Sequence, residues 1–191
     1  MLRLFFALQP APEQNAALVE RIAPLVARLD GQRVPAENLH ATLCFIGAVR
    51  REDLPRLTTL AAAQRARPVS LRFDALEFWH KPRALCAIAG ESAAAAPAHA
   101  LAASLTSAAH AAGFTPDVKP FRPHLTLARK ISFARASQCD WPQPLAPAVL
   151  VRCDRFVLME SRRGESGSIY SVLESWPLDA DERDLSSANI Q

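Results

Sequence analysis

The sequence predicts an α+β protein in which helices cover the faces of β-sheets. Three observations support this class. Segments with the two-residue period of strands alternate with segments of helical period, half of the 191 residues are apolar, and only 21% are charged. Such a chain buries a sizeable core, which excludes global disorder. The net charge of +3 is too small for a general nucleic-acid or acidic-membrane coat, so any polyanion must be recognised locally.

The expected elements follow in order along the chain. Helices are expected where apolar residues recur at three- or four-residue steps or where alanine is abundant, at 13–29, 52–67 and 97–112. Strands are expected at short apolar or alternating runs, which are 2–8, 39–46, 69–78, 84–89, 125–128, 149–159 and 169–173.

Turn residues and prolines separate these elements. Gly47 is expected to close the strand 39–46, and the prolines at 142, 144 and 147 to form a stiff connection before the final pair of strands. A turn is expected at 164–167. The sequence has no linker between independently folding units, so 1–178 is expected to form one domain and 179–191 a polar, frayed tail.

Membrane and metal-binding cysteine classes are not indicated. No apolar run approaches the roughly 18 residues that a spanning helix needs, and the apolar start is shorter than the about 7–15 residues of a secretory signal. The four cysteines are widely spaced without a C-x-x-C pair. We therefore expect reduced, buried cysteines in a cytoplasmic protein.

One short pattern occurs twice. Asn-Leu-His-Ala-Thr-Leu at 38–43 is echoed by Arg-Pro-His-Leu-Thr-Leu at 122–127. On a strand, His40 and Thr42 point to the same face while their apolar neighbours point to the core, and His124 and Thr126 do likewise. Two such strands facing a common cleft would present two imidazoles and two hydroxyls around a small volume.

These residue types suit a displacement at phosphorus. Imidazole has an unperturbed pKa near 6.5, so one neutral and one protonated histidine can remove one proton and deliver another at neutral pH. Threonine hydroxyls can hold phosphoryl oxygens without a competing charge. A metal site is the competing interpretation, but no carboxylate stands at a ligand-like spacing and threonine is a poor ligand. From these residues alone, either histidine fits either role.

The chain resembles the two-histidine (2H) phosphoesterase superfamily, in particular its LigT-like RNA 2',3'-cyclic phosphodiesterases, historically called 2'-5' RNA ligases. The resemblance runs from about residue 2 to 178, and four segments carry it: 3–8, 38–47, 119–129 and 170–178. It implies a bilobal α+β fold with pseudo-twofold symmetry, in which antiparallel sheets line a central cleft, helices lie outside, and each lobe supplies one His-x-Thr motif.

The resemblance also implies residue roles. His40 corresponds to a general acid that protonates the departing O3', and His124 to a general base that activates water. Thr42 and Thr126 correspond to residues that hold the nonbridging oxygens. Arg129 corresponds to an arginine that adds positive charge at the phosphate. Strict alternation puts Arg129 on the opposite face from His124, so this role requires a β-bulge or the strand end to turn it inward.

Further residues are candidates for substrate binding. Trp79 and Phe121 can stack a terminal base, whereas Phe5 is expected in the core. Arg122 and Arg129 can form a basic rim together with Lys130, Arg162 and Arg163. Charges at a hairpin tip such as 162–163 are equally typical of a solvated turn.

The sequence therefore predicts a metal-independent enzyme without a cofactor that hydrolyses RNA 2',3'-cyclic phosphate ends to 2'-phosphomonoesters. The expected partners are such an RNA end or a small cyclic nucleotide, with no membrane, and the expected state is a monomer. Two alternatives stay open: 2'-5' RNA ligation at the same site, and a noncatalytic RNA-binding protein on the same fold.

Overall fold

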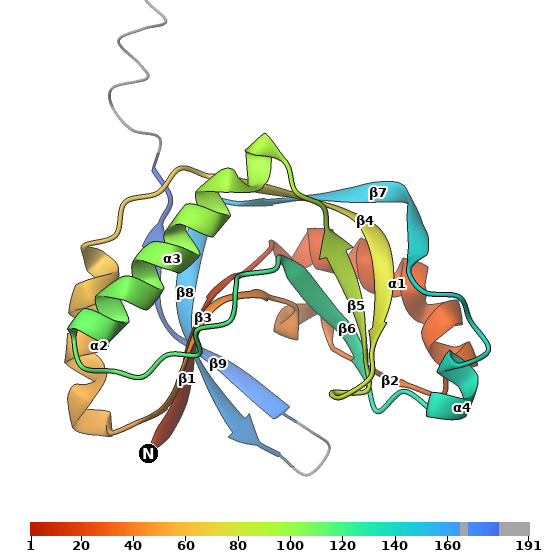
Figure 1. The fold of residues 1–191 in the computed structure, drawn as a ribbon, viewed down its shortest axis with the longest axis horizontal. Helices are drawn as coiled ribbons and strands as arrows, with labels where there is room; N and C mark the ends of the chain where they lie inside the picture. The colour runs from red at the N-terminus through yellow and green to blue at the C-terminus, as the bar shows by residue number, and fades with distance from the viewer. Residues whose placement is uncertain (165–167, 180–191) are drawn as a thin grey trace, which may run out of the picture.

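Two antiparallel sheets form the frame of the molecule in the computed structural model, which describes residues 1–164 and 168–179 (Figure 1). In spatial order, the β1 sheet consists of β3 (Ala41–Val49), β1 (Leu2–Leu8), β8 (Arg155–Arg163) and β9 (Ser168–Pro177). The β5 sheet consists of β2 (Gln32–Arg33), β6 (His124–Arg129), β5 (Ala84–Ala89), β4 (Val69–Trp79) and β7 (Gln143–Cys153). The α+β class and the pair of antiparallel sheets are confirmed.

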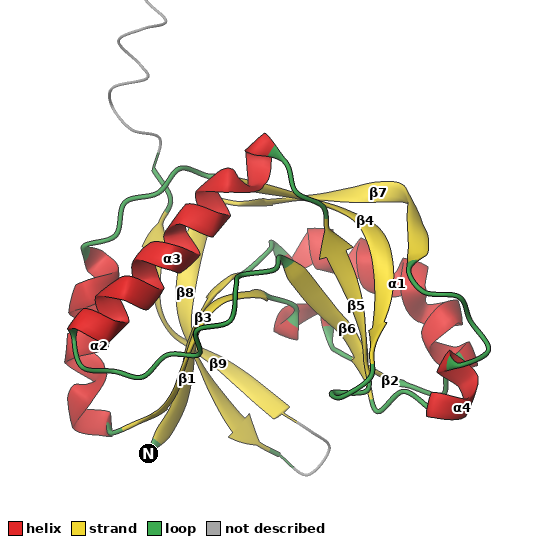
Figure 2. Ribbon diagram, in the orientation of Figure 1, coloured by secondary structure: helices red, strands yellow, loops and turns green. Residues whose placement is uncertain are grey.

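Helices lie outside the two sheets (Figure 2). They are α1 (Pro12–Arg28), α2 (Leu54–Ala62), α3 (Ala96–Ala111) and α4 (Phe133–Ala136), with short 3-10 turns η1 (Ala36–Asn38), η2 (Arg51–Asp53) and η3 (Ala93–Ala95). In α1 the buried Leu18, Ile22 and Val26 recur every four residues, which gives the helix one apolar stripe toward the core.

The covering helices are exchanged between the sheets. Helix α1 follows β1 along the chain, yet it packs against β2 and β6 of the β5 sheet. Helix α3 follows β5, yet it packs against β3 of the β1 sheet, together with α2. Figure 1 shows α1 beside one sheet and α2 with α3 beside the other. Each sheet is therefore covered by a helix that comes directly after a strand of the other.

The core has one large cluster and two small ones. Leu4, Phe6 and Leu8 of β1 belong to the large cluster, whereas the alternate residues Phe5 and Ala7 belong to a separate small cluster with Val157 and Met159 of β8. A second small cluster, on the β5 sheet, is formed by Ala84, Cys86 and Ile88. Because side chains alternate along a strand, these small clusters mark the sheet faces turned away from the helices.

The predicted strand 149–159 is wrong as a single element. It divides at Asp154, where the chain leaves β7 of the β5 sheet and enters β8 of the β1 sheet. The prolines expected in a connection lie instead at and within β7, with Pro144 opposite Ala75 at an irregularity of the ladder. Strand β7 lies at the edge of its sheet, where a residue without an N–H is tolerated.

Other expected boundaries shift less. Strand β3 continues through Gly47, which adopts a positive φ of 89°, to Val49. The helix expected at 52–67 is shorter, and β2 and α4 were not predicted. The four cysteines are free thiols, and three of them are buried. Most of the expected turn at 164–167 and of the tail at 179–191 lies outside the described residues.

Candidate active site

Both His-x-Thr motifs line one cleft of about 430 Å³ between the inner faces of the two sheets. Thr42 lies at the start of β3 and His40 directly precedes this strand, whereas His124 and Thr126 come from β6. All four side chains are partly exposed. The cleft is further lined by Arg3, Phe5, Phe45, Trp79, Pro82, Ala84, Arg129, Ser161, Arg162, Arg163, Ser168 and Tyr170. It therefore brings four arginines, and no carboxylate among the described lining residues, around the two imidazoles.

The first motif leads into a strand, β3, that does not alternate strictly. Thr42 is paired with Ala7 of β1, but Cys44 is paired with Phe6, so Leu43 is the extra residue of a bulge. The bulge turns Phe45, which strict alternation placed with the core residues, toward the cleft. Cys44, which strict alternation placed with His40, is only 2% exposed and packs in the core.

The second motif lies on a strand with a bulge of its own. Thr126 is opposite Cys86 of β5 and Ala128 is opposite Leu85, so Leu127 is the extra residue. Beyond this bulge Arg129 lines the same cleft as His124. Its Nη2 lies 3.3 Å from the hydroxyl oxygen of Tyr170 on β9, a contact that joins the two sheets across the cleft.

The two imidazoles are held by the same backbone interaction. Nδ1 of His40 donates to the carbonyl of Asn38 at 2.7 Å, and Nδ1 of His124 donates to the carbonyl of Arg122 at 2.7 Å. A carbonyl oxygen only accepts, so the proton resides on Nδ1 in both rings. Nε2 is therefore the nitrogen left to take up or release a proton in each motif.

Burial and positive charge set the acidity of both rings. Burial lowers the pKa of His40 to about 4, against the opposing effect of the Asn38 hydrogen bond and with further lowering by Arg129 and His124. Burial likewise lowers the pKa of His124, and the charges of Arg122 and Arg129 add to the effect. Both histidines are thus poised to be neutral in the empty cleft, and an anion beside Arg129 would favour their protonation.

Aromatic rings flank each imidazole. His40 lies between Phe5 and Tyr170, with both ring centroids 4.9 Å from its own. Phe5 is buried, as expected, but it lies in the small cluster of the inner sheet face and forms a wall of the cleft. His124 contacts Trp79 at a centroid distance of 4.4 Å.

The remaining substrate-binding candidates are placed unequally. Trp79 lines the cleft, whereas Arg122 forms an ion pair with Glu77 at 2.5 Å and lies over the Trp79 ring at 5.8 Å. Phe121 is not among the residues that line the cleft and instead contacts His99 of α3 at a centroid distance of 5.1 Å. The structure therefore separates Phe121 from the two motifs.

Sequence reasoning missed Glu77, which supports this side of the cleft. It accepts a hydrogen bond from Trp79 Nε1 at 3.0 Å in addition to the ion pair with Arg122. Burial acts to raise its pKa, but the hydrogen bonds from Arg122 and Trp79 prevail and lower it. Glu77 precedes Trp79 by two residues, so period-two alternation was the signal that could have paired them.

Arg3, Phe45 and Tyr170 were also not proposed as site residues. Arg3 precedes Phe5 by two residues on β1, and its guanidinium lies over the Phe45 ring at 4.7 Å. Both Arg3 and Tyr170 follow from alternation once the inner faces of β1 and β9 are known. Phe45 depends on the bulge at Leu43, which the local sequence does not reveal.

The thiol below the site is not a competing nucleophile. Cys86 Sγ lies 4.0 Å from Thr126 Oγ1. Burial raises the pKa of Cys86 to about 12, so the thiol stays protonated at neutral pH.

Within the described ranges, no three His, Cys, Asp or Glu side chains are grouped as metal ligands. No helix of the described chain is long and apolar enough to span a bilayer.

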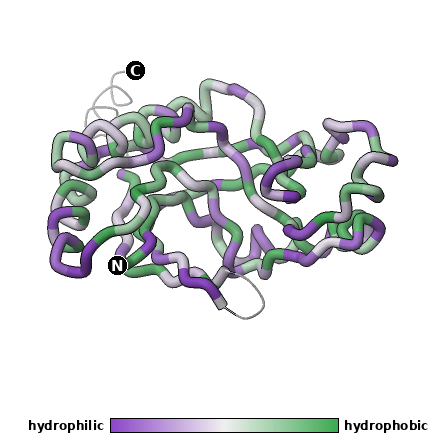
Figure 3. Tube along the Cα trace, turned by 60° about the horizontal axis from the view of Figure 1, so that its bottom comes forward, coloured by the Kyte–Doolittle hydropathy of each residue, from purple (hydrophilic) through white to green (hydrophobic). Residues whose placement is uncertain are grey.

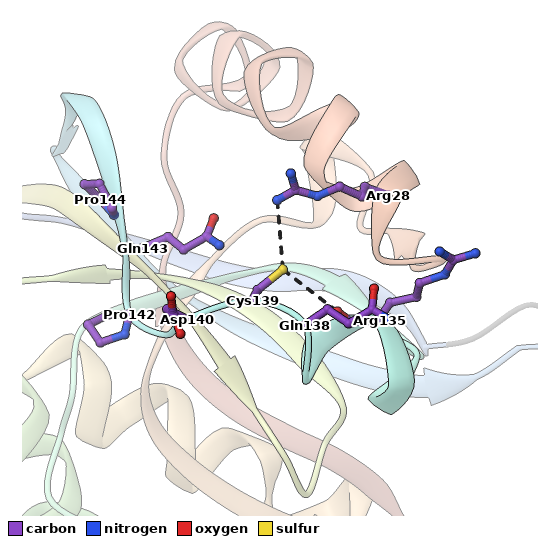
Figure 4. A pocket seen from close by; sticks show the side chains of 8 residues that line it. All are labelled: Arg28, Arg135, Gln138, Cys139, Asp140, Pro142, Gln143 and Pro144. Atoms are coloured by element: carbon purple, nitrogen blue, oxygen red, sulfur yellow. Dashed lines mark hydrogen bonds between the residues drawn. The ribbon is translucent and has the colours of Figure 1, made fainter.

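A second hollow of about 470 Å³ lies away from the motifs, near the end of α1 and beside α4 (Figure 4). Cys139 lies at its centre, with Sγ 4.0 Å from Nη2 of Arg28 and 3.8 Å from the carbonyl of Arg135. No histidine lines it, so it lacks the proton-transfer pair that the cleft has.

Comparison with known proteins yields a consistent set of relatives. The sequence profile of the 2'-5' RNA ligase superfamily matches residues 10–165. The RNA 2',3'-cyclic phosphodiesterase of Thermus thermophilus is 32% identical, with 93% of this chain and 90% of the relative covered. The protein of the same name from Escherichia coli is 33% identical over 69% of this chain and 74% of its own length. The crystal structure of E. coli LigT complexed with 3'-AMP superposes with a TM-score of 0.80 at 28% identity, covering 94% of this chain and 99% of that one.

Proposed function

The chain belongs to the 2'-5' RNA ligase superfamily, and we propose that its cleft hydrolyses RNA 2',3'-cyclic phosphate ends to 2'-phosphomonoesters without a metal ion. One observation carries the mechanism: His40 and His124, from different sheets, line one cleft with Nδ1 of each ring engaged by a backbone carbonyl. Two Nε2 atoms are thereby available to one phosphorus centre. An in-line displacement needs a base and an acid on opposite sides of that centre.

The proposed step balances its protons within this pair. Nε2 of one histidine removes a proton from water as the water oxygen bonds to phosphorus. The P–O3' bond breaks, and the other histidine donates its Nε2 proton to O3'. The products are a 2'-phosphomonoester and a free 3'-hydroxyl. Exchange with solvent then returns the two rings to their starting protonation states.

The remaining cleft groups bind charge. Thr42 and Thr126 flank the two imidazoles and offer hydroxyl donors to the nonbridging oxygens. Arg129, held by Tyr170, adds a fixed positive charge as negative charge gathers on those oxygens. Imidazole, hydroxyl and guanidinium groups supply the proton transfers and anion binding themselves, which supports a reaction without a metal ion.

The role of each histidine follows the resemblance, with His40 as acid and His124 as base. The acid must carry a proton, whereas the low pKa of about 4 makes His40 neutral in the empty cleft. A bound cyclic phosphate offsets the charge of Arg129, which opposes protonation, and adds a negative charge of its own. We infer that His40 takes up its proton together with the substrate.

Ligation is a second candidate because the matching profile is that of a 2'-5' RNA ligase superfamily. It is the same displacement with another nucleophile, in which a 5'-hydroxyl in place of water attacks the phosphorus of a 2',3'-cyclic phosphate, and the P–O3' bond breaks as O3' takes up a proton. The same acid–base pair serves both reactions. Water is in large excess, which favours hydrolysis.

Four free cysteines support a reducing, cytoplasmic location for either reaction.

The test is hydrolysis of an RNA ending in a 2',3'-cyclic phosphate, in buffer containing EDTA. The wild type is expected to release the 2'-phosphomonoester, and His40→Ala or His124→Ala should each lower turnover at least about 10²-fold, as for loss of a general acid or base. His110→Ala, at the exposed end of α3, is the matched control. Full turnover by both folded active-site variants contradicts the mechanism, and loss of wild-type activity in EDTA contradicts metal independence. Joined products with an added 5'-hydroxyl RNA would establish ligation.

A further inference from the structure

A strip of polar residues leads from the two motifs to the end of the β8–β9 hairpin. It consists of Arg3, Ser161, Arg163 and Ser168, all of which line the cleft, and is called the hairpin strip below. Ser161 and Arg163 alternate with the inner-face residue Met159, and Arg163 is paired with Ser168 across the hairpin. The end of this hairpin beside the grey trace is hydrophilic (Figure 3).

The arginines around the cleft differ in how their charge is balanced. Arg122 is paired with Glu77 at 2.5 Å, and Arg162 faces Glu160 at 3.7 Å and donates to Ser171 Oγ at 3.3 Å. Their positive charges are thus already partly neutralised, so they are weaker sites for a further anion.

The hairpin strip retains its positive charge. Arg3 is held over the Phe45 ring, which orients the guanidinium without neutralising it. Within the described part of the chain, neither Arg3 nor Arg163 has an ion-pair partner. Ser161 and Ser168 add hydroxyl groups on the same face. Two unneutralised guanidiniums with neighbouring hydroxyls form a site suited to a phosphate diester.

The hairpin strip is separate from the reacting centre but continuous with it. Tyr170 is paired with Ser161 across the hairpin, and its hydroxyl contacts Arg129. On the His124 side, Trp79 and Pro82 line the cleft, and the charge of nearby Arg122 is taken by Glu77. A terminal nucleotide placed between the motifs therefore meets unbalanced positive charge chiefly toward the hairpin.

Resting on the proposed function, we propose that the hairpin strip binds the phosphodiester one nucleotide upstream of the reacting cyclic phosphate. The cleft then recognises two consecutive phosphates. An oligonucleotide end, and not a single cyclic nucleotide, is its preferred substrate.

Three probes isolate the upstream charge. They are uridine 2',3'-cyclic phosphate, a dinucleotide ending in the same group through an ordinary phosphodiester, and that dinucleotide with an uncharged methylphosphonate linkage. The ordinary dinucleotide is expected to have a kcat/KM about tenfold above both others at low salt, the effect of charge-assisted hydrogen bonds. The advantage should shrink as salt rises.

Variants assign this advantage to the strip. The double variant Arg3→Gln/Arg163→Gln should bring the ratio of ordinary to methylphosphonate dinucleotide close to one. Arg155 lies on β8, as Arg163 does, but it is exposed and pairs with Asp154 away from the cleft. The control variant Arg155→Gln should therefore keep the wild-type ratio. Equal kcat/KM for the two dinucleotides, or an unchanged ratio in the double variant, overturns the subsite. If the wild type opens the mononucleotide but shows no dinucleotide advantage, only this inference fails. If it opens none of the probes, the proposed function fails as well.

Discussion

The two His-x-Thr motifs have the same local geometry in different surroundings. Each imidazole donates through Nδ1 to the carbonyl two residues earlier, at 2.7 Å in both cases. His40, however, lies between two aromatic rings, Phe5 and Tyr170, whereas the one ring that contacts His124 among the described residues is that of Trp79. Burial is the largest cause that lowers the pKa of His40, to about 4. Burial is also the largest cause that lowers the pKa of His124. The backbone just before each strand thus sets the tautomer, and the neighbouring rings set the acidity.

The difference suggests a division of labour between the two sides of the cleft. On the His40 side, the rings of Phe5 and Tyr170 flank the imidazole. On the His124 side, Trp79 is held by Glu77 and offers a surface for a base. Three predictions test this comparison, from the largest expected effect to the smallest.

Acid should destabilise the fold mainly through His40. Its folded-state pKa of about 4 lies below the ordinary 6.5, so the unfolded chain binds a proton first as the pH falls. This group's contribution is complete above pH 6.5 and is lost between pH 6.5 and 4, by an amount on the order of 3 kcal/mol. Two groups face His40. They are Arg129 and His124, and the charge of each also lowers the pKa of His40.

The measurement is urea unfolding at pH 7 and pH 4.5. His40→Gln should flatten the pH dependence of the unfolding free energy more than His124→Gln does. Equal slopes for the two variants would remove the proposed difference in burial.

Trp79 should act on substrate binding more than on the chemical step. Trp79→Ala is expected to raise KM about tenfold, because stacking contributes about 1–3 kcal/mol per base. Trp79→Phe, which keeps an aromatic face, should restore most of the loss. Phe133→Ala, an exposed aromatic outside the cleft, is the control. A fall in kcat at unchanged KM would instead assign Trp79 to the support of His124.

Tyr170 should contribute least through its hydroxyl. Tyr170→Phe removes the contact with Arg129 but keeps the ring against His40, so kcat/KM should fall about threefold, as for one hydrogen bond. Tyr170→Ala also opens His40 to water, which should move the acidic limb of the kcat/KM profile to higher pH. Identical pH profiles for the two variants would show that the ring does not control the acidity of His40.

Local patterns predicted what depends on neighbouring residues. The two motifs are predictable because a histidine and a threonine two residues apart share a strand face, whatever lies beside the strand. The fold class is predictable for a similar reason, because the spacing of apolar residues along the sequence follows the periods of helices and strands. The contribution of Arg129 required a bulge, and the structure has one at Leu127, where β6 pairs with β5.

The differences from the expected structure come from contacts between distant segments. Nothing near Val149 or Met159 shows that the chain changes sheets at Asp154, because both halves read as strand. Phe121 is aromatic and adjacent to a motif, but its ring packs beside α3 and does not line the cleft. Phe45 enters the cleft through a bulge determined by the partner strand β1. Residue type alone does not show whether an aromatic side chain such as Phe121 or Phe45 lines the cleft.

The exchange of covering helices has a consequence for the integrity of the molecule. A fragment ending after β5 would hold α1 without β6, and the complementary fragment would hold α3 without β3. Neither piece can bury its own apolar surfaces, so the two halves of the chain are interdependent. The spacing of the two imidazoles therefore depends on cooperative folding of the whole polypeptide. A truncation far from the cleft would abolish this spacing.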